Sequence, residues 1–297
     1  MKSTSIHNLN ADKGLNLVLK PLYLFLNWLN NLLPYSNLDK RIKIKKLELP
    51  NWQNEWSKTY PDSSAARKLS DIFWRTLPWK KIRKDLGEIH VFDTGCGQGN
   101  YGTRLSDAIA SYTGVDAKRR PNWDVLTKEH PSFHFIESKS NDILPLIPEK
   151  TNFFMSQSAI EHFDKDLKFF EQIRDFIDKT KKPAIQIHLF PGAATLPLYL
   201  FHGYRQYTPR TISKITRLFK NAEISLYGLG GAASKKLQFK YFTWPVLITR
   251  RYAKPTFDVR EYEAKLREAV VYDIKHIPKS PLFWALIIHS NPKNEIW

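Results

Sequence analysis

The chain has 297 residues, enough for one α/β domain with additions or for two small domains, and its single cysteine, Cys96, excludes an intramolecular disulfide. The net charge of +17 sits in the flanks, because residues 1–87 carry +9 and residues 201–297 carry +10, whereas residues 88–200 carry −2. Basic flanks of this kind favour an anionic partner, either nucleic acid or a membrane surface.

The first predicted element is an amphipathic helix over residues 14–34. This stretch has no acidic residue, and its polar positions recur at steps of three, four and seven, which gives one narrow polar stripe and a broad apolar face. Tyr23 and Trp28 are suited to a membrane interface. The apolar runs are too short to span a bilayer, and the segment does not resemble a cleavable signal peptide, so we expect it in the mature protein.

Two interpretations of the extension over residues 1–65 remain open. In one, the helix and the basic run at residues 40–46 bind an anionic membrane through residues 14–46, which places the protein in the cytoplasm at the inner membrane face. In the other, the helix is a lid over the following domain, Pro21 marks a kink or a helix start, and the basic run is a solvated strand. The two interpretations are compatible.

Residues 66–297 predict one domain in which helices and strands alternate. A helical pattern over residues 66–86 contains Pro78, which must begin or break a helix, and ends at Gly87. Seven strands are expected, at residues 88–93, 112–116, 133–137, 152–156, 184–189, 223–227 and 285–289, with helices at 100–111, 123–130, 165–179, 211–219 and 258–269. The sequence therefore predicts an α/β fold with a seven-stranded, mostly parallel sheet, helices on both faces, and insertions at 190–209 and 229–281.

A glycine-rich turn follows the first strand of this domain. Its residues 97–102 spell the G-x-G-x-x-G pattern of dinucleotide-binding turns. The acid at the strand end, Asp93, would repel a pyrophosphate but suits a cationic amino acid group. Asp116 ends the next strand, where an acid can hold two ribose hydroxyls. The turn predicts a pocket for a nucleoside cofactor.

Three segments together resemble one known family. Residues 93–99, 114–116 and 152–163 are similar, in this order, to the first, second and fourth-strand motifs of class I S-adenosylmethionine-dependent methyltransferases of the small-molecule and glycan type. The resemblance covers residues 88–228 and a last strand near 282–289, and it implies a Rossmann-like fold with S-adenosylmethionine as cofactor. The implied cofactor-binding residues are Asp93, Gly95, Gly97, Gly99, Asp116, Ser156 and, at the adenine, Asn141 or Asp142, for which a helix N-cap is the alternative.

Histidines near the expected methyl group are the candidates for catalysis and acceptor binding. His162 follows the fourth strand and is suited to act as a general base, or else packs in the loop, whereas Glu161 is expected to orient that loop. The loop at residues 202–210 combines donors, a cation and aromatic faces suited to a sugar or phosphate. The predicted acceptor-binding residues are His188, His202, Tyr204, Arg205 and Tyr207.

Several absences narrow the reaction. No Asn/Asp-Pro-Pro-aromatic motif follows the fourth strand, and no cysteine is placed to attack a pyrimidine, which leaves oxygen as the expected nucleophile. No cluster of carboxylates stands out, so the sequence predicts no metal site. We expect O-methylation of a glycan, a lipid-linked sugar or another envelope precursor. The alternatives are an RNA methyltransferase, although no RNA-binding module accompanies the core, an NAD-dependent enzyme using the turn at residues 97–102, and a non-catalytic binding protein.

Overall fold

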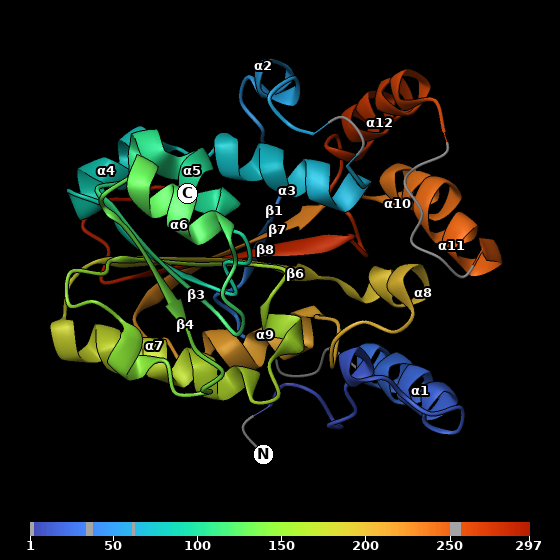
Figure 1. The fold of residues 1–297 in the computed structure, drawn as a ribbon, viewed down its shortest axis with the longest axis horizontal. Coiled ribbons are helices and arrows are strands. Elements are labelled where there is room, and N and C mark those ends of the chain that lie inside the picture. The colour runs from blue at the N-terminus through green and yellow to red at the C-terminus, as the bar shows by residue number, and fades with distance from the viewer. Residues whose placement is uncertain (1–2, 34–37, 61–62, 250–256) are drawn as a thin grey trace.

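The computed structural model describes residues 3–33, 38–60, 63–249 and 257–297 (Figure 1). In these residues the strands form one eight-stranded sheet of order β1-β7-β8-β6-β5-β2-β3-β4. The strands are β1 (Lys43–Lys45), β2 (His90–Thr94), β3 (Ser111–Asp116), β4 (Phe133–Glu137), β5 (Phe153–Gln157), β6 (Ala184–Pro191), β7 (Ala222–Leu229) and β8 (Phe283–Ser290).

The sheet is parallel except for β8, which runs antiparallel between β6 and β7. All seven predicted strands are present, with ends within two residues of the expected ones. The eighth strand, β1, pairs in parallel with β7 at the sheet edge and comes from the basic run, with Lys43 and Ile44 exposed. The basic run therefore contains a solvated strand, and the α/β class predicted from the sequence is confirmed.

Helices cover both faces of the sheet. The helices α3 (Ala65–Arg75), α4 (Trp79–Leu86), α5 (Asn100–Leu105) and α6 (Asn122–Glu129) lie over one face, and α7 (Asp166–Thr180) and α9 (Pro209–Thr216) lie over the other (Figure 1). Successive side chains of a strand point to opposite faces of the sheet. On β5, Phe153 and Met155 join one apolar cluster and Phe154 joins the other. Pro78 is the N-cap of α4 and so divides the helical pattern of residues 66–86 in two.

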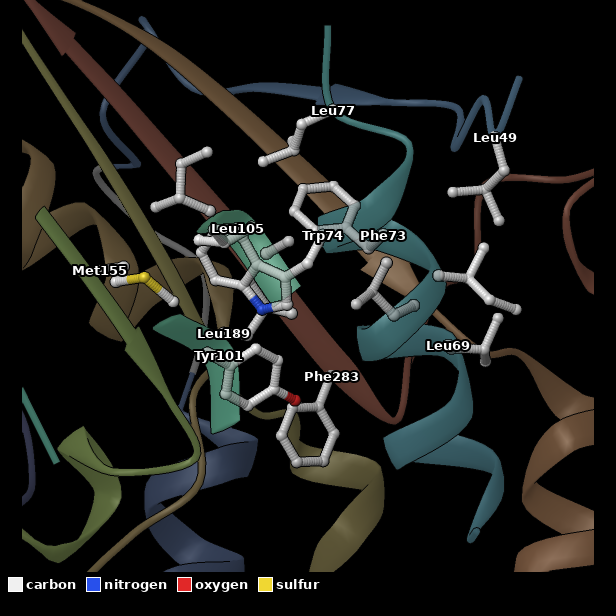
Figure 2. Close-up of a cluster of buried hydrophobic side chains, with 14 of the residues drawn as sticks. Leu49, Leu69, Phe73, Trp74, Leu77, Tyr101, Leu105, Met155, Leu189 and Phe283 are labelled. Carbon is white, nitrogen blue, oxygen red and sulfur yellow. The ribbon is translucent and has the colours of Figure 1, made fainter. Parts of the chain in front are cut away.

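One apolar cluster ties α3 to the ends of the central strands (Figure 2). Trp74 of α3 is fully buried beside Tyr101 of α5, with ring centroids 6.1 Å apart. The indole N–H donates to Gln157 at the end of β5 over 2.9 Å, and the Tyr101 hydroxyl donates to Asp71 of α3, also over 2.9 Å. These buried polar contacts fix where α3 and α5 lie relative to the strand ends.

The insertion at residues 229–281 is helical. It contains α10 (Ala232–Gln238), the π-helix η6 (Phe239–Thr243), α11 (Trp244–Thr249) and α12 (Val259–Asp273), and Arg250 and Arg251, which the sequence placed in it, lie outside the described residues. Asp273 accepts hydrogen bonds from the backbone of Gly231 and Ser234 at the start of α10. Lys68 of α3 pairs with Glu263 of α12 at 2.9 Å. The insertion is thus anchored on α3.

The first long helix, α1 (Leu19–Leu32), packs with its polar side inward. Tyr23, Asn27 and Asn30 are fully buried, whereas the apolar side chains of Phe25 and Trp28 are 54% and 52% exposed. Pro21 lies in the first turn, where its missing N–H is not needed, so it marks the helix start rather than a kink. No helix in the described ranges is both long and apolar enough to cross a membrane.

The remaining elements are short. They are η1 (Ala11–Lys13), α2 (Trp52–Trp56), η2 (Ser106–Ala108), η3 (Leu144–Leu146), η4 (Ile160–His162), η5 (Ala193–Thr195) and α8 (Leu196–Tyr199). Of these, η1 and η4 contribute to the candidate site, and η5 and α8 lie within the predicted insertion at residues 190–209.

Candidate active site

The glycine turn, residues 93–99, connects β2 to α5 in a backbone conformation that only glycine adopts without strain. Gly95, Gly97 and Gly99 have φ of +76°, +54° and +82°. A Cβ at Gly95 would lie 2.3 Å from the Cβ of Ala159, whereas a Cβ at Gly97 would meet no atom of the described residues within 4 Å. Gly95 is therefore a close packing contact, and Gly97 presents bare backbone to open space.

Asp93, the penultimate residue of β2, lies beneath this turn and is 1% exposed. Its Oδ2 accepts a 2.6 Å hydrogen bond from the Tyr112 hydroxyl, while its Oδ1 has no hydrogen-bond partner among the residues that the structure describes. Burial raises the pKa of Asp93 to about 7, against the opposing hydrogen bond from Tyr112 and with a further contribution from the charge of Asp116. A buried carboxylate oxygen without a donor is a ready acceptor for a cationic ligand group.

Asp116 ends β3 and bonds directly to the turn. Its Oδ2 accepts from the backbone N–H of Gly97 over 2.9 Å, and its Oδ1 accepts from that of Lys118 over 3.1 Å. Cys96 lies buried between these acids, and burial together with the charges of Asp93 and Asp116 raises the pKa of its thiol far above the usual range. The structure thus places Asp93, Asp116 and the three glycines together, as the sequence predicted.

The other predicted cofactor residues lie elsewhere. Asn141 and Asp142 are exposed in the loop after β4, where the Asn141 carbonyl accepts from Gln172 over 2.9 Å. Ser156 is fully buried, and its hydroxyl is 2.8 Å from Nδ1 of His188. Ser156 therefore bonds within the sheet rather than at the glycine turn, and the cofactor-binding role predicted for it does not fit this position.

His188 is also fully buried, with its ring packed against Phe169 and Phe170 of α7. Burial lowers its pKa to about 3, which keeps the ring neutral. This position corrects the prediction that His188 binds the acceptor, because its ring is inaccessible to a ligand in this arrangement.

Two residues of the predicted acceptor loop are likewise occupied in the interior. Asp166, at the start of α7, pairs with Arg205 at 2.9 Å and accepts from the Tyr207 hydroxyl over 2.9 Å. The same carboxylate accepts from both the backbone N–H and the hydroxyl of Thr4. Arg205 and Tyr207 are fully buried in this network, so they anchor the N-terminal segment instead of facing an acceptor, which corrects that prediction.

Tyr204 is buried beside them and donates its backbone N–H to the carbonyl of Glu161 over 2.9 Å. Its ring lies 5.2 Å from the Arg205 guanidinium. Gly203, with φ +61°, lets the loop approach Glu161, because a Cβ there would lie 2.7 Å from that carbonyl. Of the predicted acceptor residues, only His202 is left beside η4 with a partly exposed side chain.

His202, His162 and Glu161 form a group that we call the Glu–His cluster. Nε2 of His202 and Nε2 of His162 lie 3.6 Å and 3.9 Å from Oε1 of Glu161, and the two imidazole rings are nearly perpendicular, with centroids 4.6 Å apart. The carboxylate of Glu161 is fully buried, and the two histidine side chains are 39% and 33% exposed. The cluster therefore opens to solvent on its imidazole side.

Asp12 of η1 completes this cluster from the far end of the sequence. Its Oδ2 is 2.6 Å from Nδ1 of His162, and its Oδ1 accepts from the backbone N–H of Gly203 over 3.0 Å. Burial lowers the pKa of His162, but the hydrogen bond that its ring donates to Asp12 and the charge of Glu161 outweigh it, so the pKa is raised. No pattern in the sequence pointed to Asp12, since 150 residues separate it from His162.

Comparison with known proteins yields structural neighbours only. No protein-family model matches the chain, and no curated protein matches it by sequence. Similar solved structures include a SAM-dependent methyltransferase from Archaeoglobus fulgidus (16% identity, 73% of this chain and 94% of that one, TM-score 0.44) and a putative sarcosine dimethylglycine methyltransferase from Galdieria sulphuraria (12%, 76% and 87%, 0.47). A third is the cyclase SpnF (12%, 78% and 84%, 0.45). Likeness at this level concerns the fold alone.

Proposed function

We propose that the protein is an S-adenosylmethionine-dependent methyltransferase that methylates oxygen. The observation that carries this proposal is the buried Oδ1 of Asp93, which has no donor among the described residues and lies beneath a turn whose Gly97 faces open space. A carboxylate there fits the α-ammonium group of the methyl donor, whereas it would repel the pyrophosphate of NAD. When bound, S-adenosylmethionine supplies a methyl group that passes from sulfur to the acceptor oxygen while sulfur keeps the electron pair of the broken bond.

The residues of the turn would bind and orient this donor. Tyr112 holds one oxygen of Asp93, which leaves the other for the ammonium group. Asp116 is fixed by the backbone of Gly97 and Lys118, and each of its oxygens keeps a lone pair for a ribose hydroxyl. Methyl transfer depends mainly on the alignment of the acceptor oxygen, the methyl carbon and the sulfur. Holding the donor in a fixed orientation is therefore the main contribution that the turn can make.

The Glu–His cluster would form the acceptor side. It lies close to the turn, since Ala159 contacts Gly95 and stands two residues before Glu161. Asp12 occupies Nδ1 of His162, so Nε2 is the nitrogen that this ring offers to an acceptor. Partly exposed imidazoles beside a methyl donor suit a hydroxyl-bearing acceptor such as a glycan or a lipid-linked sugar.

A membrane surface is the partner that we propose for α1. Its apolar side chains, with Phe25 and Trp28 about half exposed, point away from the body, and exposed lysines follow at residues 40 and 43. An apolar helix face next to basic residues is typical of helices that lie on anionic leaflets. The buried polar side of α1 lies beside His202, because the Tyr23 hydroxyl donates to the His202 carbonyl over 2.8 Å. A single helix can thus cover the site and touch the membrane.

The donor assignment is tested by calorimetric titration of S-adenosylmethionine and, separately, of NAD. We expect binding of the first only, and we expect Asp93→Asn to weaken it about 10- to 100-fold, in line with the roughly 1.5–3 kcal/mol of a hydrogen bond to a charged group. Asp178→Asn, an exposed position on α7, is the matched control and should bind normally. Binding of NAD alone would overturn the proposal in favour of a dehydrogenase.

The acceptor is tested with purified enzyme and radiolabelled methyl donor on glycolipid, RNA and small-molecule fractions of a cell extract. Label in the glycolipid or small-molecule fraction supports the proposal, and label confined to RNA would select the RNA methyltransferase that the basic flanks also suit. For the membrane, flotation with anionic vesicles should be lost in Phe25→Asp/Trp28→Asp and kept in Val125→Asp, an exposed apolar position on α6. Wild-type protein that stays unbound would reject the membrane surface as a partner.

A further inference from the structure

We infer that the Glu–His cluster is a binding site for a divalent transition metal ion, with Zn²⁺ as the best fit. One donor atom from each of Glu161, His162 and His202 lies within 4.8 Å of the other two. Two imidazoles and one carboxylate are a ligand set that transition metals bind in many catalytic sites. Hard cations such as Mg²⁺ prefer oxygen ligands throughout, so the two imidazoles disfavour them.

The carboxylate of Glu161 is the first observation that points to a cation. It is fully buried, and both of its oxygens lack a hydrogen-bond partner in the described parts of the chain. Its separations from the two histidine nitrogens, 3.6 Å and 3.9 Å, are too long for hydrogen bonds. A buried carboxylate without a partner is costly, and a metal ion between these three donors would remove that cost.

The spacing of the donors suits an ion of this kind. In a tetrahedral site with bonds of about 2.0–2.1 Å, neighbouring ligand atoms lie roughly 3.3 Å apart. The carboxylate oxygen lies 3.6 Å and 3.9 Å from the two imidazole nitrogens, which is about 0.3 Å and 0.6 Å longer than that separation. The two rings are nearly perpendicular and partly exposed, and a bound ion would require them to rotate until a lone pair of each faces it.

Asp12 supplies an independent argument, because it occupies the position of an outer carboxylate in many metal sites. Its oxygen lies 2.6 Å from Nδ1 of His162, so Nδ1 carries a ring proton and Nε2 is the nitrogen that a metal ion would bind, with release of any proton on it. Metal-binding histidines usually donate their second N–H to such a carboxylate, which fixes both tautomer and orientation. The Gly203 N–H holds the other oxygen of Asp12 in place.

Three protein ligands leave coordination positions open toward solvent, which is the pattern of catalytic rather than structural sites. The following consequence rests on the proposed function. A metal at this position would bind the acceptor hydroxyl and lower its pKa, so that the proton leaves to solvent before the oxygen attacks the methyl carbon and the carbon–sulfur bond breaks. The site then favours acceptors with two adjacent oxygens, such as a diol, and His162 serves as a ligand instead of a base.

The test measures metal binding without the methyl donor, so its result is independent of the donor assignment. Protein prepared without a histidine tag and treated with chelator is titrated with Co²⁺, followed by its visible absorption, and with Zn²⁺ by competition. We expect one Co²⁺ per chain, with the intense bands of a four- or five-coordinate ion. Asp12→Asn should weaken binding about 10- to 100-fold, as is usual for outer partners, and Glu161→Gln and His202→Ala should weaken it at least as much.

His134→Ala, at an exposed histidine of β4, is the matched control and should bind as the wild type does. Circular dichroism establishes that each variant is folded, and X-ray absorption of the wild-type zinc complex needs no variant: it should give a mixed shell of two imidazole nitrogens and oxygens. Lack of stoichiometric Co²⁺ binding by the wild type overturns the inference. So does equal affinity in folded Glu161→Gln and His202→Ala, or a zinc shell without imidazole.

Discussion

The glycine turn and the Glu–His cluster lie next to each other but are built in different ways. The predicted cofactor-binding residues that the structure brings together all come from the continuous stretch 93–116, which runs through β2, α5 and β3. The cluster and its hydrogen-bond partner come from three separate places, η1, η4 and the loop after α8, and the loop is held by buried polar contacts. Local backbone geometry thus stabilises the first, and long-range polar contacts stabilise the second.

The largest effect is expected when those long-range contacts are removed. Asp166→Ala leaves the fully buried Arg205 without its partner and frees Thr4, so the free energy of unfolding should fall by about 3–5 kcal/mol. Denaturant unfolding measures this loss, and faster proteolysis near Asp12 should accompany it. Asp175→Ala, at an exposed position paired with its neighbour, should change stability by less than about 0.5 kcal/mol. Unaltered stability and proteolysis in Asp166→Ala would contradict the assignment of this network.

The next effect concerns the contact between the two regions. Gly95→Ala places a Cβ 2.3 Å from that of Ala159 at a φ of +76°. Overpacking of about 1–3 kcal/mol and a left-handed backbone cost of about 1–2 kcal/mol should together lower the free energy of unfolding by roughly 2–5 kcal/mol. Because Ala159 leads into η4, both donor and metal binding should weaken. Loss of donor binding alone would mean that the two regions are not mechanically connected here.

Gly97→Ala sharpens the comparison, because in the described part of the chain its Cβ meets no atom within 4 Å, so that the positive φ is the one cost seen there. We expect a stability loss of about 1–2 kcal/mol, intact Co²⁺ binding, and strongly weakened binding of S-adenosylmethionine, since the methyl group fills the open space beside the turn. Parallel thermal denaturation and calorimetry measure these effects. Normal donor binding would show that the ligand does not lie against Gly97.

The last prediction concerns the dependence of stability and of ligand binding on pH. The pKa of Asp93 is about 7 in the folded protein and lies near 4 in an unfolded chain, so the folded state is favoured at low pH and this contribution is lost as pH rises from about 4 through 7. A cationic ligand needs the ionised form, so affinity should rise over the same range up to pH 7. Calorimetry in buffers of different ionisation enthalpy should detect proton release on binding at pH 6. Asp93→Asn should abolish that release, and its persistence would assign the proton to another group.

The sequence predicted most of the sheet because strand and helix patterns are local. Its seven strands, the break at Pro78, and the placement of Asp93 and Asp116 follow from residues close together in the chain. The interior roles of Arg205, Tyr207 and His188 were not predictable, because their hydrogen-bond and ion-pair partners come from other parts of the chain. Asp166, which also binds Thr4, is the partner of Arg205 and Tyr207, and Ser156 is the partner of His188. Polar residues in a loop look available for a ligand until the fold supplies their partners. Asp12 was missed for the same reason.

The buried thiol described above has a practical consequence for labelling. Cys96 is the sole cysteine of the chain, and its inaccessibility and high pKa leave very little thiolate for alkylating reagents at neutral pH. A cysteine introduced at a solvent-facing position, for example in place of Trp28, would therefore react with a spin or fluorescent label, whereas Cys96 would stay unlabelled. Probes attached at single introduced cysteines can therefore report on α1 without removal of the native cysteine.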